Sequence, residues 1–238
     1  ATPYRRDGHQ PIILMQCGPV RYEIRQNELN SQTALHHVLI CRNTSFMPPT
    51  TENELSIQEI YSALIAGKAR NKLILDDILK SIEDGCSPIL LTERREHLEY
   101  FSSQLTKVVK NVIVLRGGMG IKQRRAIAEQ LASISESEKR VLLATGRYIG
   151  EGFDDARLDT LFLALPVSWK GTLVQYAGRL HRLHAGKTDA RIYDYVDQNV
   201  PMLVKMFQKR LRGYRAMGYE LDKSDKAKTS MPSLWDSL

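Results

Sequence analysis

Two arginines three residues apart, Arg179 and Arg182, are the residues of this chain best suited to phosphate chemistry. A guanidinium is always charged and presents a planar fork of donors that matches phosphate oxygens. On a helix, residues at i and i+3 share a face, so the two forks would converge on one polyphosphate. The chain has no G-x-x-x-x-G-K-[ST] loop to hold that phosphate from the other side. It therefore looks like half of a nucleotide site.

Several segments resemble, in order and at family-like spacing, the motifs of superfamily 2 helicases and translocases. ATGRYIGEGFD (144–154) resembles motif V, and QYAGRLHR (175–182) resembles motif VI, Q-x-x-G-R-x-x-R. SPILLT (87–92), followed by 93–98, resembles motif IV. Ala1-Thr2-Pro3 matches the end of motif III, which closes the first of two RecA-like domains in the family. The wording is similar to the DEAH-like or type I–III restriction-translocase branch, including type III res subunits, rather than to DEAD-box proteins.

The resemblance implies the C-terminal motor domain of an ATP-dependent helicase or translocase. Arg179 and Arg182 would act as fingers on the γ-phosphate of ATP, bound with Mg²⁺ mainly by the absent first domain. Gln175, Gly152 and Asp154 are implied as further nucleotide contacts, with Asp154 facing ribose hydroxyls. From the residues alone, a glycine-rich turn with an Asx cap is favoured for Gly152 and Asp154. Because the P-loop is missing, this chain by itself is expected to be inactive.

The predicted motif VI helix, Thr172–Leu180, contains a glycine, Gly178. Glycine costs about 1 kcal/mol relative to alanine inside a helix, so we expect a packing reason for it. The alternative for the whole segment is a surface helix with solvated arginines.

Polar residues at predicted strand ends are candidates for contact with a nucleic-acid backbone: Thr92, Arg94, Arg116, Gly117, Thr145 and Gly146. Thr92 and Arg94 offer a hydroxyl, a backbone N–H and a guanidinium to a phosphodiester, although a helix cap beside a surface arginine is the alternative. Arg116-Gly117-Gly118 permits close backbone approach, as a tight turn also would. For Thr145 and Gly146 the contact is implied by the resemblance to motif V.

Apolar runs alternate with amphipathic helices beyond Gly85. Strands are predicted over 89–92, 112–115, 141–144, 160–165 and 191–196, and helices over 95–105, 123–131, 172–180 and 202–217, with a short helix after 141–144. Continuously apolar strands alternating with helices predict an α/β fold whose mainly parallel sheet is covered on both faces. With the resemblance, this is a three-layer RecA-like, P-loop NTPase-type domain. Ligands of such sheets bind beyond the C-terminal strand ends, where the candidate residues fall.

We expect three regions along the chain. Residues 1–50 are interpreted as a remnant of the first RecA-like domain and a linker, and residues 51–218 as the second RecA-like domain. Residues 219–238 are interpreted as a basic, flexible tail. The first region contains strand-like runs at Pro11–Gln16, Val20–Ile24 and Val38–Cys41, and Pro48-Pro49 marks its end. In the second, Ser56 is expected to cap one helix, and Asp84-Gly85 to stop the next.

The charge points to a polyanionic partner. The net charge is +7, and residues 201–228 hold eight Lys/Arg against three acids. Nucleic acid, with DNA expected, would be bound through its phosphates, although a solvated helix face explains the charge as well. The N-terminal RecA-like domain is the other expected partner.

Other classes are less favoured. The three cysteines form no C-x-x-C pair, and no metal site is expected. No apolar run is long enough for a membrane span, and a cytoplasmic location is expected. A non-catalytic RecA-like nucleic-acid-binding or scaffold domain is the runner-up. A nucleotide-sugar transferase, with Gly150–Asp154 holding a diphosphate, lacks an evident acceptor base and leaves the paired arginines unused.

Overall fold

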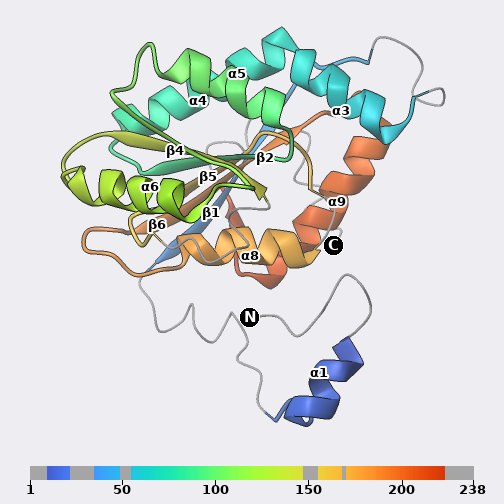
Figure 1. Cartoon of the computed structure of the whole chain (residues 1–238). Helices are drawn as coiled ribbons and strands as arrows, with labels where there is room; N and C mark the ends of the chain where they lie inside the picture. Colours follow the sequence, from blue (N-terminus) through green and yellow to red (C-terminus); the bar gives the residue numbers. More distant parts are fainter. Residues whose placement is uncertain (1–9, 22–34, 49–54, 147–154, 168–169, 223–238) are drawn as a thin grey trace.

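The computed structural model describes residues 10–21, 35–48, 55–146, 155–167 and 170–222, and a seven-stranded sheet lies at its centre (Figure 1). All strand pairs are parallel, in the order β3-β4-β2-β5-β6-β1-β7. The strands are β1 (His36–Asn43), β2 (Pro88–Thr92), β3 (Asn111–Leu115), β4 (Arg140–Thr145), β5 (Thr160–Leu163), β6 (Asp189–Val196) and β7 (Glu220–Leu221).

Helices cover both faces of this sheet, which confirms the predicted three-layer α/β fold. They are α3 (Ile57–Ala66), α4 (Lys68–Glu83), α5 (Arg95–Leu105), α6 (Ile121–Ser133), α8 (Lys170–Leu180) and α9 (Pro201–Ala216). In Figure 1, α4 and α5 lie on one side of the sheet and α6 and α8 on the other. Ser56 caps α3 in a capping box with Glu59, as its position predicted. Among the described residues, no helix is long and apolar enough to cross a membrane.

The strands are continuously apolar because both of their faces are buried. Successive side chains point to opposite faces of a sheet. In β2, Leu90 belongs to the apolar cluster beneath α4 and α5, whereas Ile89 and Leu91 belong to the cluster beneath α8 and α9. The same alternation in β4 places Val141 and Leu143 in one cluster and Leu142 and Ala144 in the other.

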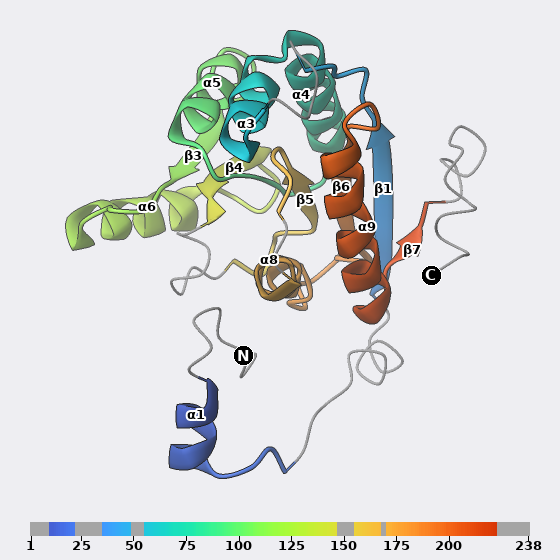
Figure 2. The ribbon, with the colours of Figure 1, turned by 90° about the vertical axis from the view of Figure 1, so that its right-hand side faces the viewer.

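Strand β1 corrects the predicted boundary at residue 50. It pairs with β6 along its whole length and with β7 on its other side (Figure 2). Leu39 and Cys41 are buried in the main core, so β1 is a full member of the domain rather than part of a linker. Strand pairing over such sequence separations is non-local, and the local pattern gave no sign of it. The sheet likewise extends past residue 218, because β7 follows it and Tyr219 is buried.

The strand predicted at Pro11–Gln16 is wrong, because these residues form helix α1 (Gln10–Cys17). A short apolar run fits either element by periodicity alone. Ile12, Leu14 and Met15 are exposed, so the side chains of α1 that the structure describes do not form a buried apolar face. Most of the run predicted at Val20–Ile24 lies outside the described residues.

A buried ion pair fixes α9 on the sheet. Arg210 donates through Nε and Nη2 to the two carboxylate oxygens of Asp194 on β6, at 2.7 and 2.8 Å. The hydroxyl of Tyr214 donates to the same carboxylate at 2.7 Å. Such a bidentate pair is geometrically specific, and removing one partner would leave the other charge buried without compensation.

The position of β1 predicts how the chain tolerates truncation. A chain of residues 35–238 should unfold cooperatively, whereas a chain of residues 51–238 should fail to form a stable domain. The shorter chain loses the buried Leu39, Cys41 and Phe46, and each large buried side chain contributes about 2–5 kcal/mol against a total of about 5–15 kcal/mol. Urea denaturation followed by circular dichroism compares the two. Equal midpoints would contradict the assignment of β1 to this domain.

Candidate nucleotide and nucleic-acid interface

The structure brings the predicted nucleic-acid-binding residues together at the C-terminal ends of three adjacent strands. β3, β4 and β2 are neighbours, and Thr92 and Thr145 are paired residues in the β2–β4 register. The backbone N–H of Gly117, just beyond β3, donates to the hydroxyl of Thr145 at 3.1 Å. Gly118 adopts a φ of 84°, so a left-handed turn directs the chain away after this bond.

Thr92 is buried, and its hydroxyl is engaged within the protein. It contacts Nδ1 of His97 on α5 at 3.2 Å, and the backbone N–H of Arg94 donates to it at 3.4 Å. These contacts are not a helix cap, because Arg94 is the N-cap residue of α5 and the described residues give that helix no side-chain cap hydrogen bond. A direct contact between Thr92 and nucleic acid stays a prediction, and in this structure the residue shapes the loop that presents Arg94.

His97 extends this network to α4. The side-chain NH₂ of Asn71 donates to the carbonyl of Ile65 at 2.7 Å, which leaves Oδ1 of Asn71 to accept from Nε2 of His97 at 3.0 Å. Burial, and secondly the charge of Arg70, lower the pKa of His97 to about 3, so the ring is neutral near pH 7. With its proton on Nε2, Nδ1 must accept from Thr92, a tautomer that follows from the network.

A buried ion pair continues the network beneath the strand ends. Nε of Arg70 on α4 donates to Oδ1 of Asp197 at 2.9 Å, and Nη1 donates to the carbonyl of Ala164 after β5 at 2.6 Å. The hydroxyl of Thr44, after β1, donates to the same oxygen of Asp197 at 2.5 Å. The polar groups at the ends of β1, β5 and β6 are therefore tied to α4.

Sequence reasoning missed Arg70, Asn71, His97 and Asp197. A signal for the first two was available, because Ile74 and Ile78 define the buried stripe of α4 and the stripe continues back to Arg70 and Asn71. A charged residue at a core-facing helix position is rarely fully buried without a partner.

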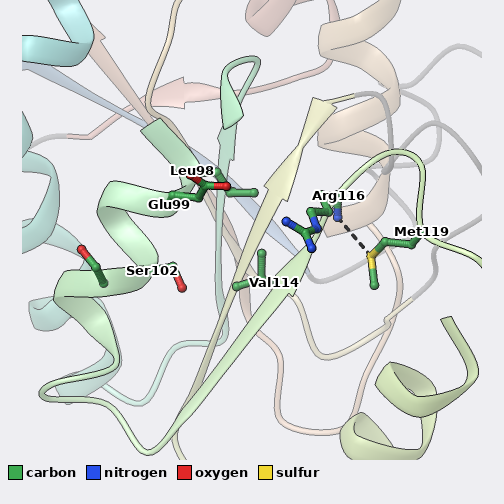
Figure 3. Close-up of a pocket in the computed structure, with 7 residues that line it drawn as sticks. Leu98, Glu99, Ser102, Val114, Arg116 and Met119 are labelled. Carbon is green, nitrogen blue, oxygen red and sulfur yellow. Dashed lines mark hydrogen bonds between the residues drawn. The ribbon is translucent and has the colours of Figure 1, made fainter. Parts of the chain in front are cut away.

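Two arginines near these strand ends are accessible to solvent, Arg94 in part and Arg116 more fully. Arg94 is partly exposed and its guanidinium donates to the side-chain oxygen of Gln58 on α3. Arg116 is exposed at the end of β3, where its backbone N–H contacts the sulfur of Met119. Figure 3 shows Arg116 and Met119 beside a surface cavity of about 420 Å³ between β3 and α5, with Glu99 and Ser102 on the facing helix.

Gly146 is buried against α8. A Cβ placed on Gly146 would lie 1.9 Å from the hydroxyl oxygen of Tyr176, so no larger residue fits. Tyr176 is 5% exposed, and burial, with the nearby charge of Glu93, raises its pKa and keeps the phenol protonated. This contact joins the motif V strand end to the helix that carries Gln175 and Arg179. The contact of Gly146 with nucleic acid stays a prediction.

The two arginines of motif VI do not share a helical face. α8 ends at Leu180, so Arg179 is in the helix and Arg182 lies in the bend that follows. Gln175 and Arg179, four residues apart on α8, do share a face. Gly178 lies between them, and a Cβ there would meet nothing within 4 Å, so the expected packing reason is absent from the described part of the domain.

The remaining predicted contacts cannot be placed. Gly152 and Asp154, and the short helix expected near them, lie in 147–154, outside the described residues. Among the described residues, no group of three or more His, Cys, Asp or Glu side chains is arranged to hold a metal.

The contact between Gly146 and Tyr176 predicts a double-mutant cycle. Gly146→Ala should destabilise the domain by about 1–3 kcal/mol, because the added methyl overpacks a buried site. Tyr176→Phe removes the clashing oxygen and should recover part of this loss, since the next atom, Cζ, is 3.0 Å away. Urea denaturation of the four proteins measures the coupling.

Gly178→Ala on the same helix is the matched control. Its methyl meets open space, so it should be neutral or stabilising by up to about 1 kcal/mol. Additive effects of Gly146→Ala and Tyr176→Phe would show that the two residues are not in contact.

Comparison with known proteins agrees with this geometry. Residues 70–184 match the family model of the helicase conserved C-terminal domain. The chain is 29% identical to the putative helicase 161L of Invertebrate iridescent virus 6, over 92% of this chain and 48% of that protein. It is 29% identical to the transcript termination protein OPG145 of Vaccinia virus, over 56% of this chain and 25% of that protein. The chain thus spans about half, or less, of these relatives.

Solved structures show the same fold. The crystal structure of T4 UvsW matches with a TM-score of 0.62 and 19% identity, over 79% of this chain and 41% of that chain. S. cerevisiae Dbp5 bound to RNA and ADP BeF3 matches with a TM-score of 0.56 and 14% identity, over 98% of this chain and 54% of that chain. Residues 70–184 therefore match the helicase conserved C-terminal domain, and the chain has the RecA-like fold of these solved structures.

Proposed function

We propose that this domain is the C-terminal half of an ATP-driven motor that moves along nucleic acid. ATP with Mg²⁺ would be bound mainly by the N-terminal RecA-like domain, which would carry the P-loop that this chain lacks. The observation that carries the proposal is the coupling of two candidate surfaces through Gly146 and Tyr176. One surface holds the strand-end groups around Arg116, and the other is the face of α8 with Arg179.

The exposed face of α8 is suited to close approach by a nucleotide-bearing partner. Gln175 and Gly178 are exposed and Arg179 is partly exposed. Gly178 lowers helix stability, and within the described domain no close packing requires a glycine there. The missing side chain leaves the helix surface open beside Arg179. An arginine fork there would reach a γ-phosphate when the two domains close. Asp154 and Gly152 would complete the nucleotide contacts.

The strand-end surface would hold the phosphate backbone. The guanidinium groups of Arg94 and Arg116 favour phosphate over base contacts, so little sequence preference is expected. The Dbp5 relative of this fold was solved with RNA, which supports a nucleic-acid partner. DNA remains our expected substrate, and DNA and RNA oligonucleotides of equal length test it.

Binding of single-stranded nucleic acid by the 238-residue chain should depend on Arg116. Arg116→Ala should weaken binding of a single-stranded oligonucleotide and reduce the slope of log K against log salt by about 0.7, the value for one lost phosphate contact. Fluorescence anisotropy across a salt series measures both. Arg125→Ala is the control, because this arginine is also exposed but is paired with Glu129 on α6. If Arg116→Ala and Arg125→Ala weaken binding equally, the binding depends on overall charge and not on a specific contact of Arg116.

Turnover should depend on the motif VI arginines in a protein that includes the P-loop domain. Arg179→Ala or Arg182→Ala should lower kcat by a factor that approaches about 10³–10⁵, which is the contribution of an arginine finger. The effect on KM for ATP should be smaller. Lysine should not rescue either position, since an ammonium lacks the bidentate fork. Steady-state phosphate release at saturating nucleic acid measures this.

Two controls accompany that experiment. The 238-residue chain by itself should release no phosphate from ATP, and Arg125→Ala in the longer protein should behave as wild type. If kcat is unchanged in both alanine variants of motif VI, the domain is not a source of arginine fingers. A non-catalytic nucleic-acid-binding domain would then account for the fold better.

A further inference from the structure

Arg182 is held in place by contacts other than those of a helix. α8 ends at Leu180, and Arg182 lies in the bend beyond it. The carbonyl of Arg182 accepts from Nζ of Lys187 at 2.9 Å. The same ammonium donates to the carbonyls of Leu158 at 2.5 Å and Ala156 at 3.4 Å. Lys187 therefore connects the backbone of Arg182 to the segment that leads from motif V into β5.

The residue before Arg182, His181, belongs to a stack of three rings. Its ring lies 4.3 Å from that of His37 on β1, at an interplanar angle of 23°. The ring of His37 also stacks on Tyr219, with centroids 5.1 Å apart. Nε2 of His181 and the hydroxyl of Tyr219 are 3.0 Å apart and share a hydrogen bond. Three separate parts of the chain, β1, the end of α8 and the approach to β7, thus meet at His181.

The stack is built as a fixed contact. His37 is 7% exposed and Tyr219 is 2% exposed. Nε2 of His37 is buried without a hydrogen-bond partner among the described residues. The face of the His37 ring stacks on His181 and Tyr219. Burial lowers the pKa of His37 and, with the neighbouring charges, lowers that of His181 to about 3. Both rings are neutral near pH 7 and stack without repulsion.

We propose that His181 is a positioning residue for Arg182. The His37–His181–Tyr219 stack fixes the bend on one side of Arg182, and Lys187 fixes its carbonyl on the other. The arginine is then presented in one place before the two motor domains meet. This inference rests on the proposed function in one respect, namely that Arg182 contacts the phosphates of ATP.

Backbone dynamics of the 238-residue chain test the positioning directly. In ¹⁵N relaxation measurements, the order parameter of Arg182 should be about 0.85 in the wild type and fall below about 0.6 in His181→Ala. His181→Phe and Tyr219→Phe each keep the stacked rings and lose the hydrogen bond between residues 181 and 219, so both should retain most of the wild-type value. His184→Ala is the control, since this nearby ring contacts its neighbouring carbonyl and Glu136 rather than the stack. An unchanged order parameter in His181→Ala overturns the proposal.

The second arm uses a protein that includes the P-loop domain. His181→Ala should lower kcat of the nucleic-acid-stimulated ATPase about tenfold with KM for ATP within twofold, and His181→Phe should restore most of kcat. If His181 only stabilised the fold, His181→Ala and the wild type would have equal kcat values at temperatures well below the unfolding temperature. That result overturns the proposal. If the wild-type protein has no ATPase, the proposed function fails, and the relaxation measurement decides the positioning of Arg182 independently.

Discussion

The pairing of Arg70 with Asp197 is the constraint on which the strand ends depend. The side chains of Arg70 and Asp197 are 1% and 0% exposed, so neither charge is hydrated and each needs the other. Because Arg70 also binds the carbonyl of Ala164 and Asp197 accepts from Thr44, α4 is attached to the ends of β1, β5 and β6. Asn71, the next residue, extends the attachment through His97 to the end of β2. The loops that leave these strands therefore begin from fixed points, which rigid placement of phosphate contacts requires.

The second consequence is a connection between the two candidate surfaces. Gly146 follows β4 directly, and Tyr176 lies on α8 one residue after Gln175. A Cβ on Gly146 would require Tyr176 to shift, so the end of β4 and α8 are packed directly against each other. On the far side, Asp194 holds Arg210 and Tyr214 and so attaches α9, which packs beside α8. The proposed nucleotide contact at the motif VI arginines and the proposed nucleic-acid contact at the strand ends would thus be made on one rigid body. The proposed coupling of hydrolysis to movement requires such a connection.

The sequence predicted most of the α/β alternation and less of what holds it together. α5 begins and ends where predicted, and β2, β4 and β6 lie within two residues of their predicted bounds, because buried parallel strands are continuously apolar and their covering helices are amphipathic. The position of β1 was missed because its partners, β6 and β7, are distant in sequence. The end of α8 at Leu180 agrees with the predicted helix, but the prediction that Arg182 shares a helical face with Arg179 was wrong, because Arg182 lies beyond that end in a bend held by contacts of His181 and Lys187. Arg70 and Asn71 were not singled out although they lie on the buried stripe of α4, since a charge there makes sense only once Asp197 is placed. For Gly146 the resemblance implied a contact with nucleic acid, which stays a prediction, and the structure adds a packing reason for the glycine in the nearby hydroxyl of Tyr176.

If Arg182 contacts ATP as proposed, the end of α8 is half of an active site that is ordered before the two domains meet. An arginine stabilises a departing phosphoryl group best when its position is set beforehand, since no reorganisation then opposes the reaction. At Arg182 the backbone is fixed by its neighbours while the residue itself is exposed. The conformational entropy of ordering that segment is lost when the domain folds rather than when the domains close. In the proposed motor, closure would then align two rigid bodies, and the energy of nucleotide binding would be left to drive their relative movement.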